Sequence, residues 1–212
     1  MRALIALVLA LSAAAAQAQE FRKIDGLLPS RAEFDVPDGY FRHWDADVGC
    51  KANALRMLVT FTRFGKPTTA WKPAVAVIFQ YGSDQTRQDI AKFSLVAASF
   101  APPFRASLAT MRATPQHPDG EYLQNENYAA SYEGDGAIPI SITWSADGEV
   151  AATFDGEERT ISLHGPIDHI KIVGSSGAGV LEPLEIGTIG DPSAATGCKP
   201  VARAEGVAPS RG

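Results

Sequence analysis

The sequence AIPISITWSADGEVAATFDGEERTISLHGPIDHIKIVGSSGAGVLEPLEIGTI, residues 137–189, decides the fold class. Short runs rich in Ile, Val, Thr and Phe alternate in it with turn residues. Asp147-Gly148 and Asp155-Gly156 each separate two such runs, and Asp-Gly favours tight hairpin turns because both residues accept positive φ. A Gly165-Pro166 turn and a glycine-rich break at residues 174–179 follow, the latter interpreted as a flexible β-turn. The stretch therefore predicts a meander of about five short antiparallel strands.

Alternation of apolar and polar residues predicts strands upstream as well. In residues 53–64, Leu55, Met57 and Val59 fall on one face, which is typical of a strand with one buried side. Further strands are predicted at residues 74–81, 90–100 and 107–114. The alanines of residues 90–100 would also suit a short helix, but their alternation favours a strand.

Residues 138–144 show the same alternation with large side chains. The even-numbered positions are all large and apolar: Ile138, Ile140, Ile142 and Trp144. The polar side chains of Ser141, Thr143 and Ser145 face the other way. This pattern places the Trp144 indole on the buried face of its strand, so we expect a core residue and not a ligand-stacking one.

Several of these motifs together resemble a known group of proteins. A strand ends on Trp144, a Ser-Ala-Asp-Gly turn follows, the next strand closes on Phe-Asp-Gly, and Ile-Lys-Ile-Val-Gly leads into a Gly-rich segment and Leu-Glu-Ile-Gly. The run resembles the C-terminal half of a concanavalin A-like jelly roll, a group that includes laminin G-like, pentraxin-like and glucanase-like domains. The resemblance implies an all-β, antiparallel two-sheet β-sandwich of jelly-roll type. The alternative is an unrelated β-sandwich with the same turn chemistry.

The first 18 residues have the pattern of a targeting segment. Arg2 precedes an apolar run at residues 4–11, and Ala16-Gln17-Ala18 matches the small-x-small cleavage pattern. The run is short for a membrane span, although an uncleaved anchor is the alternative. We therefore predict a signal peptide at 1–18, a single β-sandwich domain at 19–191, a flexible tail at 192–212, and a secreted or periplasmic protein.

The charge of the chain is mildly acidic. The formal net charge is −5, from 19 basic and 24 acidic residues, and no basic cluster of five or more occurs. Nucleic acids and anionic membrane surfaces both require concentrated Lys and Arg, so neither is expected as a partner. No later stretch is apolar enough to predict membrane insertion.

The chain has two cysteines, Cys50 and Cys198. In an oxidising compartment an even number predicts one disulfide bond, which would pin the C-terminal segment to the sandwich. By chain entropy such a long loop would stabilise the fold by about 4 to 5 kcal/mol. Two free thiols are the alternative.

No catalytic residue is predicted. Glucanases of the group that the chain resembles carry a closely spaced Glu-x-Asp-x-Glu strand, and this sequence has none. Glu185 and the pair Glu157-Glu158 are more simply interpreted as solvated charges at strand ends. No Gly-x-Ser-x-Gly motif occurs either. A divergent glycan-active enzyme nevertheless remains an alternative.

Metal and cofactor sites have weak support. His164 and His169 flank the Gly165-Pro166 turn, but zinc needs three or four such ligands, so no metal is predicted. No cofactor is predicted. Calcium is the alternative on the fold analogy, with the loop carboxylates Asp119, Glu133 and Asp135 as its oxygen ligands.

Residues 114–136 have the most unusual composition of the chain. Tyrosines, amides and acids dominate this segment, which has almost no aliphatic residues. Sugars are bound by aromatic rings that stack on their C–H faces and by amides that bond their hydroxyls. If residues 121–128 form a strand, Tyr122 and Tyr128 point to the same face, because their spacing is even. The predicted ligand-binding residues are Tyr122, Asn125, Asn127, Tyr128, Tyr132 and, in an earlier loop, Trp71.

These observations predict a non-catalytic binding module for a glycan or another component of the cell envelope. The alternative for the tyrosine-rich segment is an ordinary polar strand whose rings cover the edge of the sandwich. In that case a structural or protein-interaction role in the envelope would be favoured.

Overall fold

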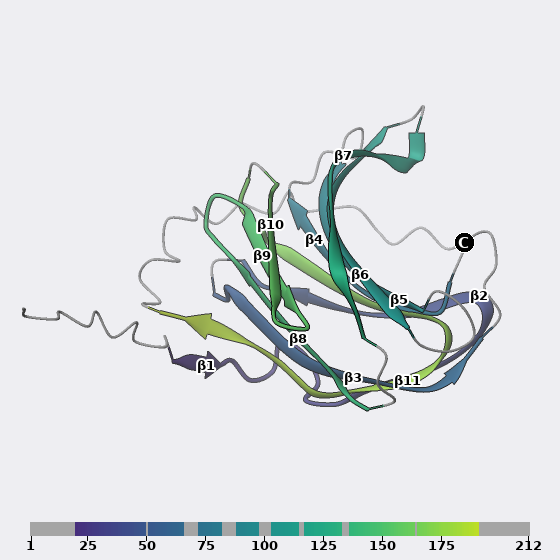
Figure 1. Ribbon diagram of the computed structural model, residues 1–212. Helices are drawn as coiled ribbons and strands as arrows, with labels where there is room; N and C mark the ends of the chain where they lie inside the picture. Colours follow the sequence, from purple (N-terminus) through teal and green to yellow (C-terminus); the bar gives the residue numbers. More distant parts are fainter. Residues whose placement is uncertain are drawn as a thin grey trace, which may run out of the picture.

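The computed structural model describes residues 20–49, 51–65, 72–81, 88–97, 103–114, 117–132, 136–163 and 165–190. Every regular element in these ranges is a strand, and every pairing is antiparallel (Figure 1). The strands are β1 (Phe21–Lys23), β2 (Ala32–Asp47), β3 (Ala54–Phe64), β4 (Ala74–Tyr81), β5 (Gln88–Ala97), β6 (Phe104–Thr114), β7 (His117–Tyr132), β8 (Ile138–Trp144), β9 (Glu149–Phe154), β10 (Glu157–Ser162) and β11 (His169–Ile189).

Two layers are built from one continuous sheet. Its strand order is β10-β9-β8-β3-β11-β4-β5-β6-β7, and β1 and β2 pair with the other edge of β11. The N-terminal part of β11 pairs with β4, and the C-terminal part pairs with β3, so β11 belongs to both layers. One layer continues through β4–β7 and the other through β3 and β8–β10. The predicted all-β, antiparallel sandwich is confirmed.

The sheet passes from one layer to the other at a bulge in β11. The register with β2 shifts between Ser175 and Gly177, and Ser176 has a φ of +48°. The Ser176 hydroxyl accepts a hydrogen bond from the Gly39 N–H at 3.0 Å, and its carbonyl accepts one from Gly65 at 2.8 Å. Bulges of this kind bend a strand and raise its twist, which allows β11 to serve both layers.

The glycine-rich segment at residues 174–179 is therefore not a turn between two strands, and the sequence-based interpretation was wrong. It is the middle of β11, and its glycines have a packing role. A Cβ on Gly174 would lie 2.5 Å from Phe34 Cγ, and one on Gly179 would lie 2.7 Å from Phe34 Cε1. The Phe34 ring, which is 2 % exposed, packs directly against the β11 backbone.

The hairpins and the main strands agree with the sequence. Asp155 and Gly156 have φ values of +50° and +78°, as a tight β-hairpin turn of the I′ type requires, and Gly148 has +86°. The strand predicted at 74–81 is β4, and residues 90–97, the described part of the segment at 90–100, belong to a strand, β5, and not to a helix.

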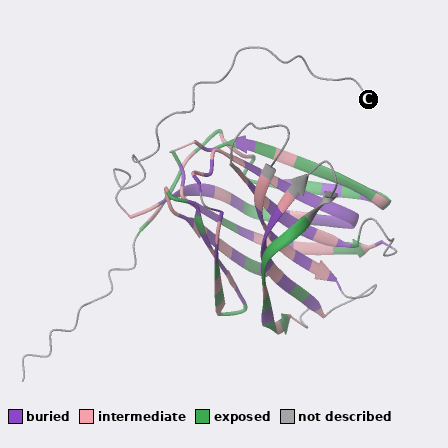
Figure 2. Ribbon diagram, turned by 90° about the horizontal axis from the view of Figure 1, so that it is seen from above, coloured by how far each residue is buried: buried purple, intermediate pink, exposed green. Residues whose placement is uncertain are grey.

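The core lies between the two layers. Alternate residues of β4, β5 and β6 face β8, β9 and β11, which gives the banded pattern of buried and exposed residues in Figure 2. Trp144 is 6 % exposed and its ring centroid lies 5.5 Å from that of Phe79, so its predicted place in the core is confirmed.

Some predictions concern parts of the chain outside the described residues. These parts hold the predicted signal peptide, both cysteines of the predicted disulfide, Trp71 and the predicted C-terminal tail. Within the described ranges no helix is long and apolar enough to cross a membrane.

Candidate functional site

Residues 117–132 of the tyrosine-rich segment form β7, at the edge of the β4–β7 layer. One face of this layer looks away from the core. Inward-facing Val77 and Phe93 are fully buried, so the alternate positions form the outer face. In Figure 1, β6 and β7 bow toward β8–β10, which makes the outer face the hollow one. We call it the β4–β7 outer face; the register assigns to it Ala74, Ala76, Ile78, Gln80, Ile90, Lys92, Ser94, Val96, Arg105, Ser107, Ala109, Met111, Tyr122, Asn125, Asn127 and Ser131.

A bulge in β7 decides which of the predicted residues share this face. Met111 pairs with Tyr122 but Thr110 pairs with Gln124, so Leu123 is an extra residue. A single inserted residue reverses the alternation of side chains beyond it. Tyr122 therefore lies on the same face as Asn125 and Asn127. All three side chains are exposed, and 60 % of Tyr122 is accessible.

The same bulge separates Tyr122 from Tyr128, so the prediction that these two rings share a face was wrong. Tyr128 is 7 % exposed and points into the core. Its ring makes edge-to-face contacts with Phe93 and Phe154, with centroids 6.1 and 5.7 Å away. Its hydroxyl donates to the Ala152 carbonyl at 2.5 Å, and burial raises the pKa of the phenol well above its usual range.

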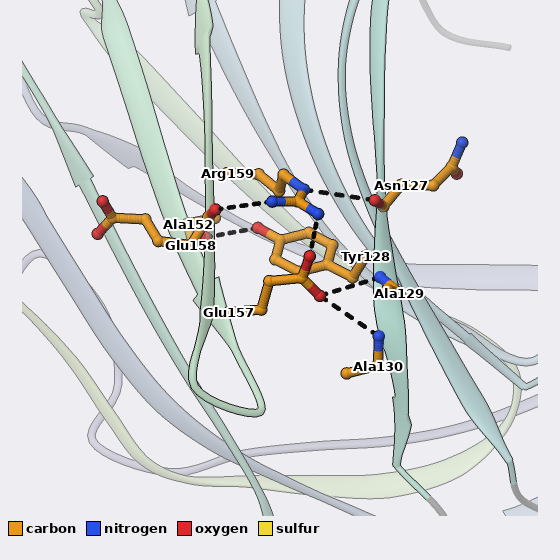
Figure 3. A network of polar contacts seen from close by, with 8 residues as sticks. All are labelled: Asn127, Tyr128, Ala129, Ala130, Ala152, Glu157, Glu158 and Arg159. Carbon is orange, nitrogen blue, oxygen red and sulfur yellow. Dashed lines mark hydrogen bonds and ion pairs between the residues drawn. The ribbon is translucent and has the colours of Figure 1, made fainter.

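Side chains close the gap between β7 and β10 beside this ring (Figure 3). Glu157 accepts hydrogen bonds from the N–H groups of Ala129, at 2.9 Å, and Ala130, at 3.3 Å, and pairs with Arg159. The Asn127 carbonyl accepts a bond from Arg159, while the Asn127 side chain points away from the network. Glu157 is thus a structural link between the layers and not merely a solvated charge, as the sequence had suggested.

The other predicted site residues are less informative. Tyr132 is half-buried, packs against the core, and its hydroxyl lies 3.5 Å from the Ala137 carbonyl. Trp71, Glu133 and Asp135 lie outside the described residues, and the Asp119 side chain is not described. Their roles stay predictions. The structure brings together Tyr122, Asn125 and Asn127, and places Tyr128 elsewhere.

Polar groups from β5 and β6 complete the face beside the two asparagines. Ser107 pairs with Asn127, and Ser94 pairs with Ser107, so two hydroxyls continue the row inward from β7. A pocket of about 300 Å³ opens between β6 and β7, where Arg105 and Asn127 are among its lining residues. A second pocket, of about 500 Å³ and with a mostly apolar lining, lies on the other layer around Leu58 and Pro139.

A charged cluster lies on the same side of the sheet, on β2 and β11. His169 Nδ1 lies 3.1 Å from an Asp47 oxygen, and His169 Nε2 lies 3.0 Å from Asp45. Asp45 also contacts His43 at 3.1 Å and Lys171 at 3.8 Å. Both carboxylates are thus held by cationic or hydrogen-bonding partners. In the described ranges no three or more His, Cys, Asp or Glu side chains are arranged to hold a metal ion.

Sequence reasoning missed the residues at the centre of the face. Lys92 lies between Ile78 and Ala109 in register, and Arg105 lies beside Val96. The alternation of residues 90–96 could have revealed that Lys92 shares a face with Ser94, but pairing β5 with β6 and β7 required the structure.

Comparison with known proteins adds little to this description. No family model matches the chain, and no curated protein matches it. Among solved structures, a double mutant of congerin II is 12 % identical, with 74 % of this chain and 98 % of that chain covered at a TM-score of 0.45. Porphyranase B from Zobellia galactanivorans is 10 % identical, and the match covers 70 % of this chain and 67 % of that chain at a TM-score of 0.44. The CBM2 module of the evolved Dit of Lactobacillus casei BL23 phage J-1 is 14 % identical, and the match covers 74 % of this chain and 67 % of that chain at a TM-score of 0.36.

Proposed function

We propose that this protein is a non-catalytic module that binds a glycan on the β4–β7 outer face, at the β7 edge. One observation carries the proposal: the β7 bulge places an exposed tyrosine ring on the same face as two exposed asparagine amides. A ring for stacking beside amides for hydroxyl hydrogen bonds is the combination that a sugar requires. The predicted signal peptide supports a location outside the cytoplasm, where such polymers occur.

The chemistry of the face supports binding more than hydrolysis. Hydrolysis of a glycosidic bond normally needs two carboxyl groups across the bond. None of the described outward positions of β4–β7 is Asp or Glu. The nearest acidic pair by register, Asp45 and Asp47, is engaged with His169 at the far strands of the sheet.

The test is a comparison of two exposed tyrosines. Tyr122 and Tyr40 are 60 % and 65 % exposed, but only Tyr122 lies on the β4–β7 outer face. Binding of wild type, Tyr122→Ala and Tyr40→Ala to an array of soluble polysaccharides is measured by affinity electrophoresis and then by calorimetry. We expect Tyr122→Ala to weaken binding about three- to tenfold, the range of a stacking contact, and Tyr40→Ala to leave it unchanged.

Both substitutions should leave the melting temperature nearly unchanged, because the side chains are exposed. Asn125→Ala and Asn127→Ala should weaken binding in the same way as Tyr122→Ala. Wild-type protein that binds no polysaccharide on the array, or equal losses in Tyr122→Ala and Tyr40→Ala, would overturn the proposal.

A further inference from the structure

The β4–β7 outer face has a charge opposite to that of the whole chain. The protein carries a net charge of −5. The described outward positions of β4–β7 nevertheless include two cations, Lys92 and Arg105, and no carboxylate. Their positive field is therefore not neutralised within the face, and it favours an anionic ligand over a cationic one.

Lys92 lies in the middle of this face and has no partner there. Its register neighbours are Ile78 and Ala109, and it forms no hydrogen bond or ion pair with a described residue. The side chain is half-buried, and burial lowers the pKa of its ammonium group. An ammonium that is partly removed from water without a counter-charge costs free energy, which a bound anion would offset.

The sheet geometry places Lys92 within reach of a ligand held at β7. Lys92 pairs with Ala109, and Ala109 pairs with Asn125, so two strand spacings separate them. This corresponds to ~10 Å between the backbones, a distance that long side chains and one sugar ring fill. Arg105 adds a second cation one strand away from β7, beside the pocket that Asn127 helps to line.

We infer that the glycan bound at this face is acidic, with a carboxylate or sulfate group that accepts hydrogen bonds from Lys92 Nζ. The inference rests on the proposed function and names its ligand class. The sugar ring that carries the anion lies between β5 and β7, where Asn125 and Tyr122 contact its neighbours in the polymer. A second anionic group along the polymer pairs with Arg105.

The experiment compares matched charged and neutral polymers. Calorimetry measures the binding of polygalacturonate, of the same polymer after reduction of its carboxyl groups, and of a sulfated galactan before and after desulfation. The proteins are wild type, Lys92→Gln, and Lys23→Gln as a matched lysine control on β1 in the other layer. Loss of a charge-assisted hydrogen bond should lower the affinity of Lys92→Gln for the charged polymer about tenfold or more.

We expect wild type to prefer a charged polymer over its neutral form, and its affinity to fall as salt rises. Lys23→Gln should bind as wild type does. If the preference is seen with polygalacturonate, the bound anion is a carboxylate, and if it is seen with the sulfated galactan, the bound anion is a sulfate. Lys92→Gln should melt no lower than wild type, since it removes a partly buried charge, so weaker binding cannot be attributed to misfolding.

Two results would overturn the inference while leaving the proposed function in place. One is equal binding of the charged and neutral forms by wild type, and the other is unchanged binding of the charged polymer by Lys92→Gln when Tyr122→Ala weakens it. Absence of binding to every polymer would overturn both.

Discussion

The hydroxyl of Tyr128 on β7 donates a hydrogen bond to the carbonyl of Ala152 on β9, and this contact ties together two layers that no strand pairing joins on that side. The ring crosses the core between Phe93 and Phe154 to reach it. Together with Glu157, Tyr128 thus connects the β4–β7 layer, which carries the proposed binding face, to the layer that supports it.

Tyr128→Phe tests this connection. The variant keeps the ring but leaves the Ala152 carbonyl without its tyrosine partner, so the free energy of unfolding should fall by about 1 kcal/mol. Tyr128→Ala should cost about 3 to 5 kcal/mol, because it also removes a large side chain from the core. Urea denaturation measures both values. A stability of Tyr128→Ala equal to that of Tyr122→Ala would show that Tyr128 is not a core residue.

The buried phenol also predicts a loss of stability at alkaline pH. Burial raises the pKa of Tyr128, so the folded protein keeps the phenol proton after the unfolded chain has lost it. This contribution is fully present below pH ~10, the pKa of an exposed tyrosine, and is lost as the pH rises further. Above pH 10, wild type should lose up to about 1.4 kcal/mol per pH unit more than Tyr128→Phe does. Parallel pH profiles for the two proteins would contradict this.

Glu157 should matter more for stability than its neighbour in the sequence. Its carboxylate accepts hydrogen bonds from two N–H groups of β7 and pairs with Arg159 (Figure 3). Glu157→Ala should therefore cost about 1 to 2 kcal/mol. Glu158→Ala is the matched control, since its side chain is not used in the link, and it should change stability by less than about 0.5 kcal/mol. Equal effects of the two substitutions would remove Glu157 from the link.

The sequence was sufficient for the fold wherever the deciding interactions are local. Asp155-Gly156 specifies a hairpin turn by its own φ preferences, and the alternation of residues 138–144 specifies which face is buried. The side of β7 on which Tyr122 lies depends instead on the bulge at the extra residue Leu123. The amino-acid composition around Leu123 does not reveal this bulge. One inserted residue therefore reversed the relation between Tyr122 and Tyr128 that their even spacing had predicted.

The glycines of β11 show the same limit. Read locally, residues 174–179 have the composition of a turn. They nevertheless lie within a strand, paired with β2, β3 and β4. Gly174 and Gly179 are glycines because the ring of Phe34, far away in the sequence, needs the space that a Cβ would occupy. The importance of Lys92 was likewise invisible locally, because it depends on which residues of β4 and β6 lie beside it.

Substitution of these glycines tests the packing directly. Neither Gly174 nor Gly179 has a positive φ, so alanine is acceptable to the backbone and the cost must come from contacts of the new Cβ. At Gly174 these contacts are with Phe34, and at Gly179 they are with Phe34 and with the Thr60 carbonyl oxygen, 2.8 Å away. With Cβ positions only 2.5 and 2.7 Å from ring atoms, Gly174→Ala and Gly179→Ala should each lower the free energy of unfolding by about 1 to 3 kcal/mol, the range for overpacking a core. Gly136→Ala is the control, because its Cβ would lie at an ordinary 3.5 Å from the Tyr132 hydroxyl, and it should change stability by less than about 0.5 kcal/mol.

Phe34→Leu should recover part of the loss in Gly179→Ala, because a smaller side chain leaves room for the new methyl group. Urea denaturation of the single and double variants measures this coupling, and additive effects would show that Phe34 and Gly179 are not in contact.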